Sequence, residues 1–286
     1  EQNVIQTAYH ILVASTPELL EQGKGDIWDS GKIESDASQW IAYQGKTLKR
    51  NAPYYWKVKI DTNKGTTDWS TPAFWTTGLF NEADWQGQWI GLDKAAPGDS
   101  ETQWSRLAAR YLRKEFALKK EVKRATVHIA GMGLYELFIN GQRIGNQVLA
   151  PAPTDYRKTI LYNTYDVTSL LQTENAIGVT LGNGRFYTMR QNYKPYKIPT
   201  FGYPKLRLNL IVEYADGSKE TIATNTSWKL TTEGPIRSNN EYDGEEYDAR
   251  KELGAWTQTG YDDKNWMPAQ RVSIPSGTLR AQMMPG

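Results

Sequence analysis

The sequence predicts an all-β protein of two sandwiches, because short alternating segments separated by turns dominate it and long helical periodicity is nearly absent. Its 286 residues suggest about two domains, at ~100–200 residues per domain. Eleven tryptophans and 17 tyrosines stand beside only 6 phenylalanines. Trp and Tyr combine an apolar face with a polar edge, which suits sandwich cores and also sugar stacking. We therefore assign most of these rings to the cores.

Residues 1–80 form the first predicted unit, a small antiparallel sandwich. We expect its strands at residues 8–14, 40–43, 54–61 and 72–77. In the third of these, Trp56 and Val58 lie on one face and Lys57 and Lys59 on the other, because successive strand residues point to opposite faces. The alternation predicts a central strand with one face in a core.

A connector at residues 81–103 is predicted to separate this unit from the second. It begins with the tryptophan-rich run 84–91 and ends in the polar stretch 94–103, whose composition is typical of a surface loop. The second unit is expected at residues 104–275. Residues 276–286 are typical of a linker that is cut short, so we expect the chain to be a fragment of a longer protein.

The second unit is predicted to be a jelly roll, because it holds eight or more strand candidates. We expect strands at residues 111–118, 125–130, 134–139, 142–149, 159–165, 176–181, 206–214 and 221–224. Asn140-Gly141 lies between the third and fourth of these and is the strongest two-residue hairpin signal. The clearest strand is 206–214, where leucines alternate with polar residues. Residues 166–171 predict one capped helical turn.

The charge balance and the residue counts exclude several classes of function. The 34 basic and 32 acidic residues give a net charge of +2, which argues against a nucleic-acid binder with its strongly basic face. Cysteine is absent, so disulfides, thiolate metal sites and cysteine nucleophiles are excluded. His10 and His128 are too few for a histidine-rich metal site or a Ser-His-Asp triad. No run of about 18 apolar residues occurs, so we expect no membrane span.

The densest acidic segment, residues 241–250, admits three interpretations. Paired carboxylates such as Glu245 and Glu246 could act as the acid and base of glycoside hydrolysis. Clustered carboxylates could instead bind calcium, although their spacing does not match an EF-hand loop. The plainest interpretation is an acidic loop with an ion pair to Arg250, or an interface to another domain.

Two further loops carry the residue types that bind sugars. Asp155, Tyr156 and Arg157 follow a proline-containing segment, and together they can hydrogen-bond to a sugar and stack on it. Residues 182–185, Gly-Asn-Gly-Arg, include two glycines that let the backbone approach a neighbour closely. No helix or acidic ribose ligand follows them, which excludes a dinucleotide loop. A salt-bridged loop and a turn at a strand end are the corresponding structural interpretations.

Seven motifs spread over the chain occur together in one protein family. They are Trp89-Ile90-Gly91, Arg113-Lys114-Glu115-Phe116, Phe138-Ile139-Asn140-Gly141, Asp155-Tyr156-Arg157-Lys158, residues 162–171, Leu181-Gly182-Asn183-Gly184 and residues 244–250. In this order, after a first unit that ends Trp75-Thr76-Thr77-Gly78, they resemble the N-terminal half of a bacterial α-L-rhamnosidase of glycoside hydrolase family 78. The resemblance covers essentially the whole chain. It implies a fibronectin-III-like sandwich followed by a galactose-binding-like jelly roll.

The resemblance also implies a role. In that family the catalytic acid and base lie on a later (α/α)6 barrel, so no catalytic residue is assigned to this chain. It implies a non-catalytic N-terminal fragment, a scaffold whose partners are a rhamnose-containing glycan and the catalytic domain of the same chain. The parent enzyme would act on terminal L-rhamnose in the periplasm or outside a bacterial cell. Glu1 opens the chain without an apolar leader, so any signal peptide is expected to have been removed or to lie outside this sequence.

Some members of the family use a jelly roll as a calcium-assisted rhamnose-binding module. This chain departs from their pattern at Gly145-Asn146, where an acidic residue is frequent, and at residues 151–153, where Pro-Gly-Trp is frequent. Losing a carboxylate weakens a hard-cation site, and losing the Trp removes a stacking face. The sugar-binding residues that we expect are Asp155, Tyr156, Asn183, Arg185 and Tyr187. No cofactor is required, although Asn146 and Asp155 could help to hold calcium.

Three other hypotheses stay open on the sequence. They are a stand-alone carbohydrate-binding module, a complete small enzyme that uses the carboxylates of residues 243–248, and a fibronectin-like adhesion protein. An open reading frame that continues past Gly286 into helical sequence would favour the rhamnosidase hypothesis over the small enzyme.

Overall fold

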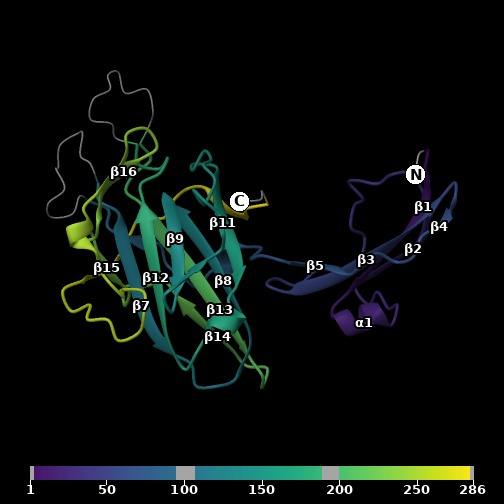
Figure 1. Ribbon diagram of the computed structural model, residues 1–286, viewed down its shortest axis with the longest axis horizontal. Helices are drawn as coiled ribbons and strands as arrows, with labels where there is room; N and C mark the ends of the chain where they lie inside the picture. The colour runs from purple at the N-terminus through teal and green to yellow at the C-terminus, as the bar shows by residue number, and fades with distance from the viewer. Residues whose placement is uncertain (1–2, 95–106, 189–199, 284–286) are drawn as a thin grey trace. The chain divides into compact units, whose positions relative to one another are not determined.

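The computed structural model describes residues 3–94, 107–188 and 200–283, and the chain divides into two compact units, residues 1–80 and 81–286 (Figure 1). Nearly all of the regular structure in the described residues is β-strand, which confirms the predicted all-β class. No helix among these residues is long and apolar enough to cross a membrane.

The first unit is built on one antiparallel sheet of strand order β2-β1-β3-β4, with β5 also paired to β3. Its elements are β1 (Gln6–Ala14), α1 (Pro17–Glu21), β2 (Trp28–Glu34), β3 (Pro53–Thr62), β4 (Gly65–Thr66) and β5 (Ala73–Thr76). Three of the four predicted strands are confirmed as β1, β3 and β5. The predicted alternation also holds, since Trp56 and Val58 pack with Ile11 on one face, whereas Lys57 lies over the ring of Trp69.

The predicted strand at residues 40–43 is wrong. Trp40 has a φ of 59°, in the left-handed region, so the chain cannot stay extended there. Residues 36–49 cross one face of the sheet as an irregular cover instead, and Ile41 and Leu48 pack against the rings of that face. The apolar residues at 40–43 therefore contact the sheet without pairing with a strand.

The second unit is a sandwich of two facing sheets, which confirms the predicted architecture (Figure 1). One sheet has the order β10-β9-β12-β7-β15-β18, and the other has β19-β6-β13-β8-β11-β20, with β14 also paired to β13. The strands are β6 (Ile90–Gly91), β7 (Arg110–Ala117), β8 (Val122–Met132), β9 (Leu134–Ile139), β10 (Gln142–Ile144), β11 (Thr159–Asp166), β12 (Glu174–Gly182), β13 (Lys205–Tyr214), β14 (Lys219–Ala223), β15 (Lys229–Thr231), β18 (Met267–Pro268), β19 (Gln270–Arg271) and β20 (Thr278–Ala281). A separate ribbon joins β16 (Ile236–Asn240) to β17 (Gly244–Tyr247).

Two local predictions for this unit are confirmed. Asn140 and Gly141 join β9 to β10 with φ values of 50° and 84°, the double left-handed conformation of a tight hairpin turn. The expected helical turn at residues 166–171 is present as a 3-10 turn at Thr168–Leu170. The residue types at 140–141 and at 166–171 were therefore sufficient to predict the turn at each place.

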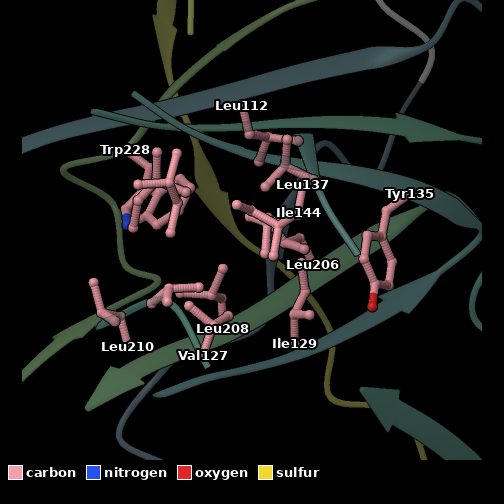
Figure 2. Close-up of a cluster of buried hydrophobic side chains, with 14 of the residues drawn as sticks. Leu112, Val127, Ile129, Tyr135, Leu137, Ile144, Leu206, Leu208, Leu210 and Trp228 are labelled. Carbon is pink, nitrogen blue, oxygen red and sulfur yellow. The ribbon is translucent and has the colours of Figure 1, made fainter. Parts of the chain in front are cut away.

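The core of the second unit lies between its two sheets. Figure 2 shows Leu112 and Leu137 from one sheet meeting Ile129 and Leu206 from the other, beside Trp228. These five side chains are almost completely buried. Packing of this kind supplies most of the driving force for folding, because burial removes apolar surface from water.

The other face of β13 is polar and holds the chain segment at residues 81–94. Arg207 donates from Nε to the carbonyl oxygen of Gly87 at 2.7 Å. Asn209 accepts from the amide of the same glycine through Oδ1 at 2.8 Å. Lys205 pairs with Asp93. Buried polar groups must find partners, so these contacts fix the segment on the sheet.

The described parts of the predicted connector and of the predicted C-terminal linker each contribute one strand to the sheets of the second unit. Trp85 and Trp89 are buried, and β6 follows them to pair with β13. At the other end, β20 pairs in parallel with β11. Residues 95–103 of the expected surface loop lie outside the described residues.

We predict that Gly87→Ala destabilises the second unit by about 1–3 kcal/mol, the usual cost of overpacking. A Cβ at Gly87 would lie 2.5 Å from the carbonyl oxygen of Leu208 and 2.7 Å from Oγ1 of Thr224. Denaturant unfolding measures the loss. Gln86→Ala, at the exposed neighbouring position, is the control, and equal stability of the two variants would contradict the close approach.

We predict a pH dependence of stability from His128, which is fully buried on β8 beneath the ring of Trp85. Burial lowers the pKa of His128 from 6.5 to about 4, so the folded state keeps the ring neutral where the unfolded chain takes up a proton. The neutral ring therefore adds to the free energy of unfolding, by on the order of 3 kcal/mol. This contribution is complete above pH ~6.5 and is lost as the pH falls to about 4. Unfolding free energies of the wild type and His128→Gln should converge over this range, and parallel pH profiles would contradict the assignment.

Candidate functional site

A cleft of about 680 Å³ opens on the second unit, over the sheet that contains β9 and β12. Its floor and walls come from three sources: strands β9, β10 and β12, the loops at residues 148–156 and 184–185, and the β16–β17 ribbon. The polar side chains that line it are Tyr135, Glu136, Arg143, Tyr156, Thr180, Arg185, Asn239, Asn240, Glu241 and Glu245. The acidic ribbon and the two predicted sugar loops therefore meet at one place.

The glycines of the second loop serve the packing of this region. A Cβ at Gly182 would lie 2.8 Å from Oδ1 of Asn239, and a Cβ at Gly184 would lie 2.7 Å from Cγ of Leu134. Gly184 also has a φ of 48°. The close approach that the sequence indicated is thus made to the ribbon and to β9.

Arg185 is the best-placed cation of the cleft. It donates from Nη1 to the Tyr242 hydroxyl at 2.5 Å, and the same nitrogen lies 3.6 Å from Oε2 of Glu241. Its guanidinium also lies over the Tyr242 ring, 5.8 Å from the centroid. Arg185 therefore joins the loop after β12 to the ribbon, and its side chain stays 30 % exposed toward the cleft.

Two of the other predicted sugar-binding residues are buried and are engaged by neighbouring residues of the protein. Tyr156 is 4 % exposed and packs edge-on against Phe186 and Phe201, so only its edge reaches the cleft. Asn183 is 1 % exposed and donates from Nδ2 to the carbonyl oxygens of Leu107 and Asn239, both at 2.8 Å. Neither side chain presents an open face to a ligand.

Tyr187 and Asp155 lie outside the set of residues that line the cleft. Tyr187 is buried and stacks on Tyr203 with a centroid distance of 5.8 Å. Asp155 pairs with Arg157 at 3.0 Å and lies 3.8 Å from the Lys158 ammonium. The structure therefore brings Tyr156 and Arg185 together and leaves the other three elsewhere.

The residues suggested for calcium do not fit a calcium ion. Calcium requires six to eight oxygen ligands, several of them anionic. The hydrogen bond from Arg157 lowers the pKa of the Asp155 carboxyl, which is thus already paired with a cation. Asn146 is exposed, and within the described residues no group of three His, Asp or Glu side chains could hold a metal.

Two acidic residues in or beside the acidic segment at residues 241–250 have partners from the same stretch of chain. Asp248 accepts two hydrogen bonds from Arg250, both at 2.8 Å, and they lower the pKa of its carboxyl to about 2. Glu252 pairs with the Tyr247 hydroxyl. The expected ion pair to Arg250 is thus present, and it keeps Asp248 ionised.

Sequence reasoning missed part of the cleft. Val148 and Leu149 line it at 75 % and 71 % exposed, and Leu149 has a φ of 57°. Glu136 lines it beside Arg143, with which it pairs at 3.1 Å. The alternation of β9 could have placed Glu136 on the outer face, but nothing local indicates that the ribbon would cover it.

The described residues form a two-unit, all-β protein whose second unit is a sandwich with a polar cleft. The chain belongs to the family described as the α-L-rhamnosidase N-terminal domain, whose model matches residues 120–286. A second model, a Rha78A-like N-terminal immunoglobulin domain, matches residues 1–81, where the sequence indicated a sandwich of the related fibronectin-III type. The family resemblance inferred from the seven motifs is confirmed.

Similar proteins share most of this chain but are much longer. An α-L-rhamnosidase of Formosa agariphila is 39% identical over 98% of this chain, which spans 31% of the relative. The solved structure of an α-L-rhamnosidase from Dictyoglumus thermophilum aligns with a TM-score of 0.87 at 40% identity, over 100% of this chain and 32% of that one. That of native α-L-rhamnosidase from Aspergillus terreus aligns at 0.82 and 31% identity, over 96% and 31% of the two chains.

We predict that Tyr156 stabilises the second unit through the packing of its ring. Tyr156→Ala should destabilise the second unit by about 3–5 kcal/mol, the usual cost of removing a buried aromatic ring, whereas Tyr156→Phe should stay within about 1 kcal/mol of the wild type. Thermal unfolding compares the two variants. A Tyr156→Phe variant as unstable as Tyr156→Ala would show that the hydroxyl, rather than the ring, stabilises the second unit.

Proposed function

We propose that this chain is a non-catalytic N-terminal part of an α-L-rhamnosidase that acts on terminal L-rhamnose of glycans. Its role is that of a scaffold for a catalytic domain in the same polypeptide. Membership of the N-terminal domain family supports this, as does the share of about a third that the chain takes of its relatives' length.

Family membership carries the proposal, and the ionised state of one candidate carboxyl group supports it. Glycoside hydrolysis requires one carboxylic acid with a raised pKa and a second carboxylate held across the scissile bond. In the described part of the chain, the carboxyl groups whose pKa clearly departs from its usual value all depart downward. Among the candidate carboxylates of residues 243–248, Asp248 is held ionised by Arg250, so it does not supply that acid.

We predict that the purified chain does not hydrolyse an aryl α-L-rhamnoside, whereas a protein extended to the full length of the relatives does. A colorimetric assay at high enzyme concentration measures release of the aryl group. Turnover by the chain alone that is abolished in Glu245→Gln or Glu246→Gln would overturn the proposal, with Glu174→Gln, an exposed carboxylate outside the cleft, as the control.

Carbohydrate binding at the cleft is a second candidate function, because the cleft gathers Arg185, Asn240 and Glu241, whose polar groups can bond to sugar hydroxyls. The aromatic side chains that line it, Tyr135 and Tyr156, are 7 % and 4 % exposed, so a sugar ring finds no open stacking face there. Any binding should be weak for this reason.

We predict millimolar or undetectable binding of L-rhamnose, roughly −4 kcal/mol at best. Calorimetry with and without calcium should give the same result, because Asp155 is paired with Arg157. Micromolar affinity that is lost in Arg185→Ala would establish the cleft as a binding module. Micromolar affinity that depends on calcium and on Asp155 would contradict the assignment of that carboxylate to an ion pair.

A further inference from the structure

The loop at residues 148–156 exposes two aliphatic side chains at the wall of the cleft. Val148 and Leu149 both line the cleft, and both are largely exposed. Leu149 also has a φ of 57°, and a bulky side chain in the left-handed region is an outlier that costs free energy. The loop therefore holds apolar surface in water through a costly backbone conformation. Contact with another apolar surface would offset the cost of the exposure.

The C-terminal end of the described chain lies against the same loop. Pairing of β20 with β11 fixes the last strand in the sheet. The residue that follows this strand, Gln282, accepts through Oε1 from the amide of Ala152, within the loop, at 3.0 Å. Met283 comes next and is almost fully exposed. In a longer protein, the polypeptide that follows would therefore start beside the exposed aliphatic side chains.

The cleft also offers a carboxylate to a cation from outside. The two arginines that line it are engaged, since Arg143 pairs with Glu136 at 3.1 Å and Arg185 lies 3.6 Å from Glu241. Glu245 lines the cleft and is exposed, and it forms no ion pair with any cation of the described residues. A complementary surface would carry an apolar side chain together with a Lys or Arg.

These features fit a protein surface better than a sugar. A sugar ring stacks on an open aromatic face, and the two aromatic rings that line the cleft, Tyr135 and Tyr156, are buried. Protein interfaces combine an apolar centre with a polar rim, which is what the loop and the ribbon supply together. The relatives also contain the polypeptide that such an interface requires, because this chain spans only 31% and 32% of two of them.

We propose that Val148, Leu149 and Glu245 form the docking surface for the catalytic domain of the same polypeptide. That domain covers the two aliphatic side chains and places a Lys or Arg beside the carboxylate. The inference rests on the proposed function, because it requires the catalytic domain to be present. It deepens that proposal by naming the surface through which the scaffold holds its partner.

Hydrogen exchange tests the docking in an extended protein, which has the full length of the relatives. The amides of Val148 and Leu149 lie outside any strand, so they should exchange rapidly in the 286-residue chain. In the extended protein we expect them to exchange roughly ten-fold more slowly, because the catalytic domain covers the loop. The exposed turn at residues 225–227 should exchange equally in the two proteins.

Two variants separate docking from other sources of protection. Val148→Asp buries a charge in the apolar contact, and Glu245→Lys repels the partner's cation, so each should return the loop of the extended protein to rapid exchange. Neither should lower the thermal midpoint of the 286-residue chain, in which both side chains are exposed. Thr226→Asp is the matched control, since Thr226 is exposed, β-branched and outside the cleft, and it should change neither quantity.

Several outcomes would overturn the proposal. They are equal exchange of the loop in the two proteins, and protection that persists in Val148→Asp. Protection of the 286-residue chain by L-rhamnose, with rapid exchange in the extended protein, would instead identify a sugar site. Protection that rises with the concentration of the 286-residue chain would identify a second copy as the occupant. Assays of the same preparations on an aryl α-L-rhamnoside separate the two proposals. An inactive extended protein contradicts the proposed function, whereas an active one with an unprotected loop contradicts only the docking surface.

Discussion

The two-faced strand β13 is the constraint on which the second unit depends. Leu206 and Leu208 on one face fill the core between the sheets, while Arg207 and Asn209 on the other hold Gly87 by its carbonyl and amide groups. Burying an unpaired guanidinium or amide is costly, so these polar side chains require a partner from the chain. The segment at residues 81–94 supplies it. One strand thus packs the core and fixes the piece of chain that precedes the sandwich.

The need of buried polar groups for hydrogen-bond partners also explains which side chains stay accessible at the candidate site. Residue types that bind sugars are also those that bond to backbone, and Asn183 and Asp155 are committed to Leu107 and Arg157 respectively. What stays accessible is a cleft lined by Arg185 and by acidic groups, of which Glu136 pairs with Arg143 and Glu241 lies 3.6 Å from Arg185. A polar cleft of this kind supports the scaffold role proposed above. It agrees with membership of a family defined by the N-terminal domains of α-L-rhamnosidases.

Local patterns predicted most of the longer strands, but they missed β2, extended β10 to residue 149, and did not indicate what covers the strands. Alternation was sufficient for β3 and β13, and Asn140-Gly141 for the hairpin, because period and turn chemistry are properties of adjacent residues. The contact of Arg207 with Gly87 spans 120 residues, and that of Asn183 with Asn239 spans 56. No local signal encodes such pairs. For the same reason the sequence placed Tyr156 and Arg185 near one site but could not supply the ribbon that walls it.

The most direct test of this account is native-state hydrogen exchange at the backbone amides of Gly87 and Gln88, which donate to Oδ1 of Asn209 and to the carbonyl oxygen of Thr224. If β13 holds the segment as part of the second unit, both amides should exchange only through global unfolding, as slowly as those of Leu208 and Leu210. Rapid exchange at Gly87 and Gln88 while β13 stays protected would show that the segment is a tether, and would contradict the claim that the outer face of β13 organises the unit.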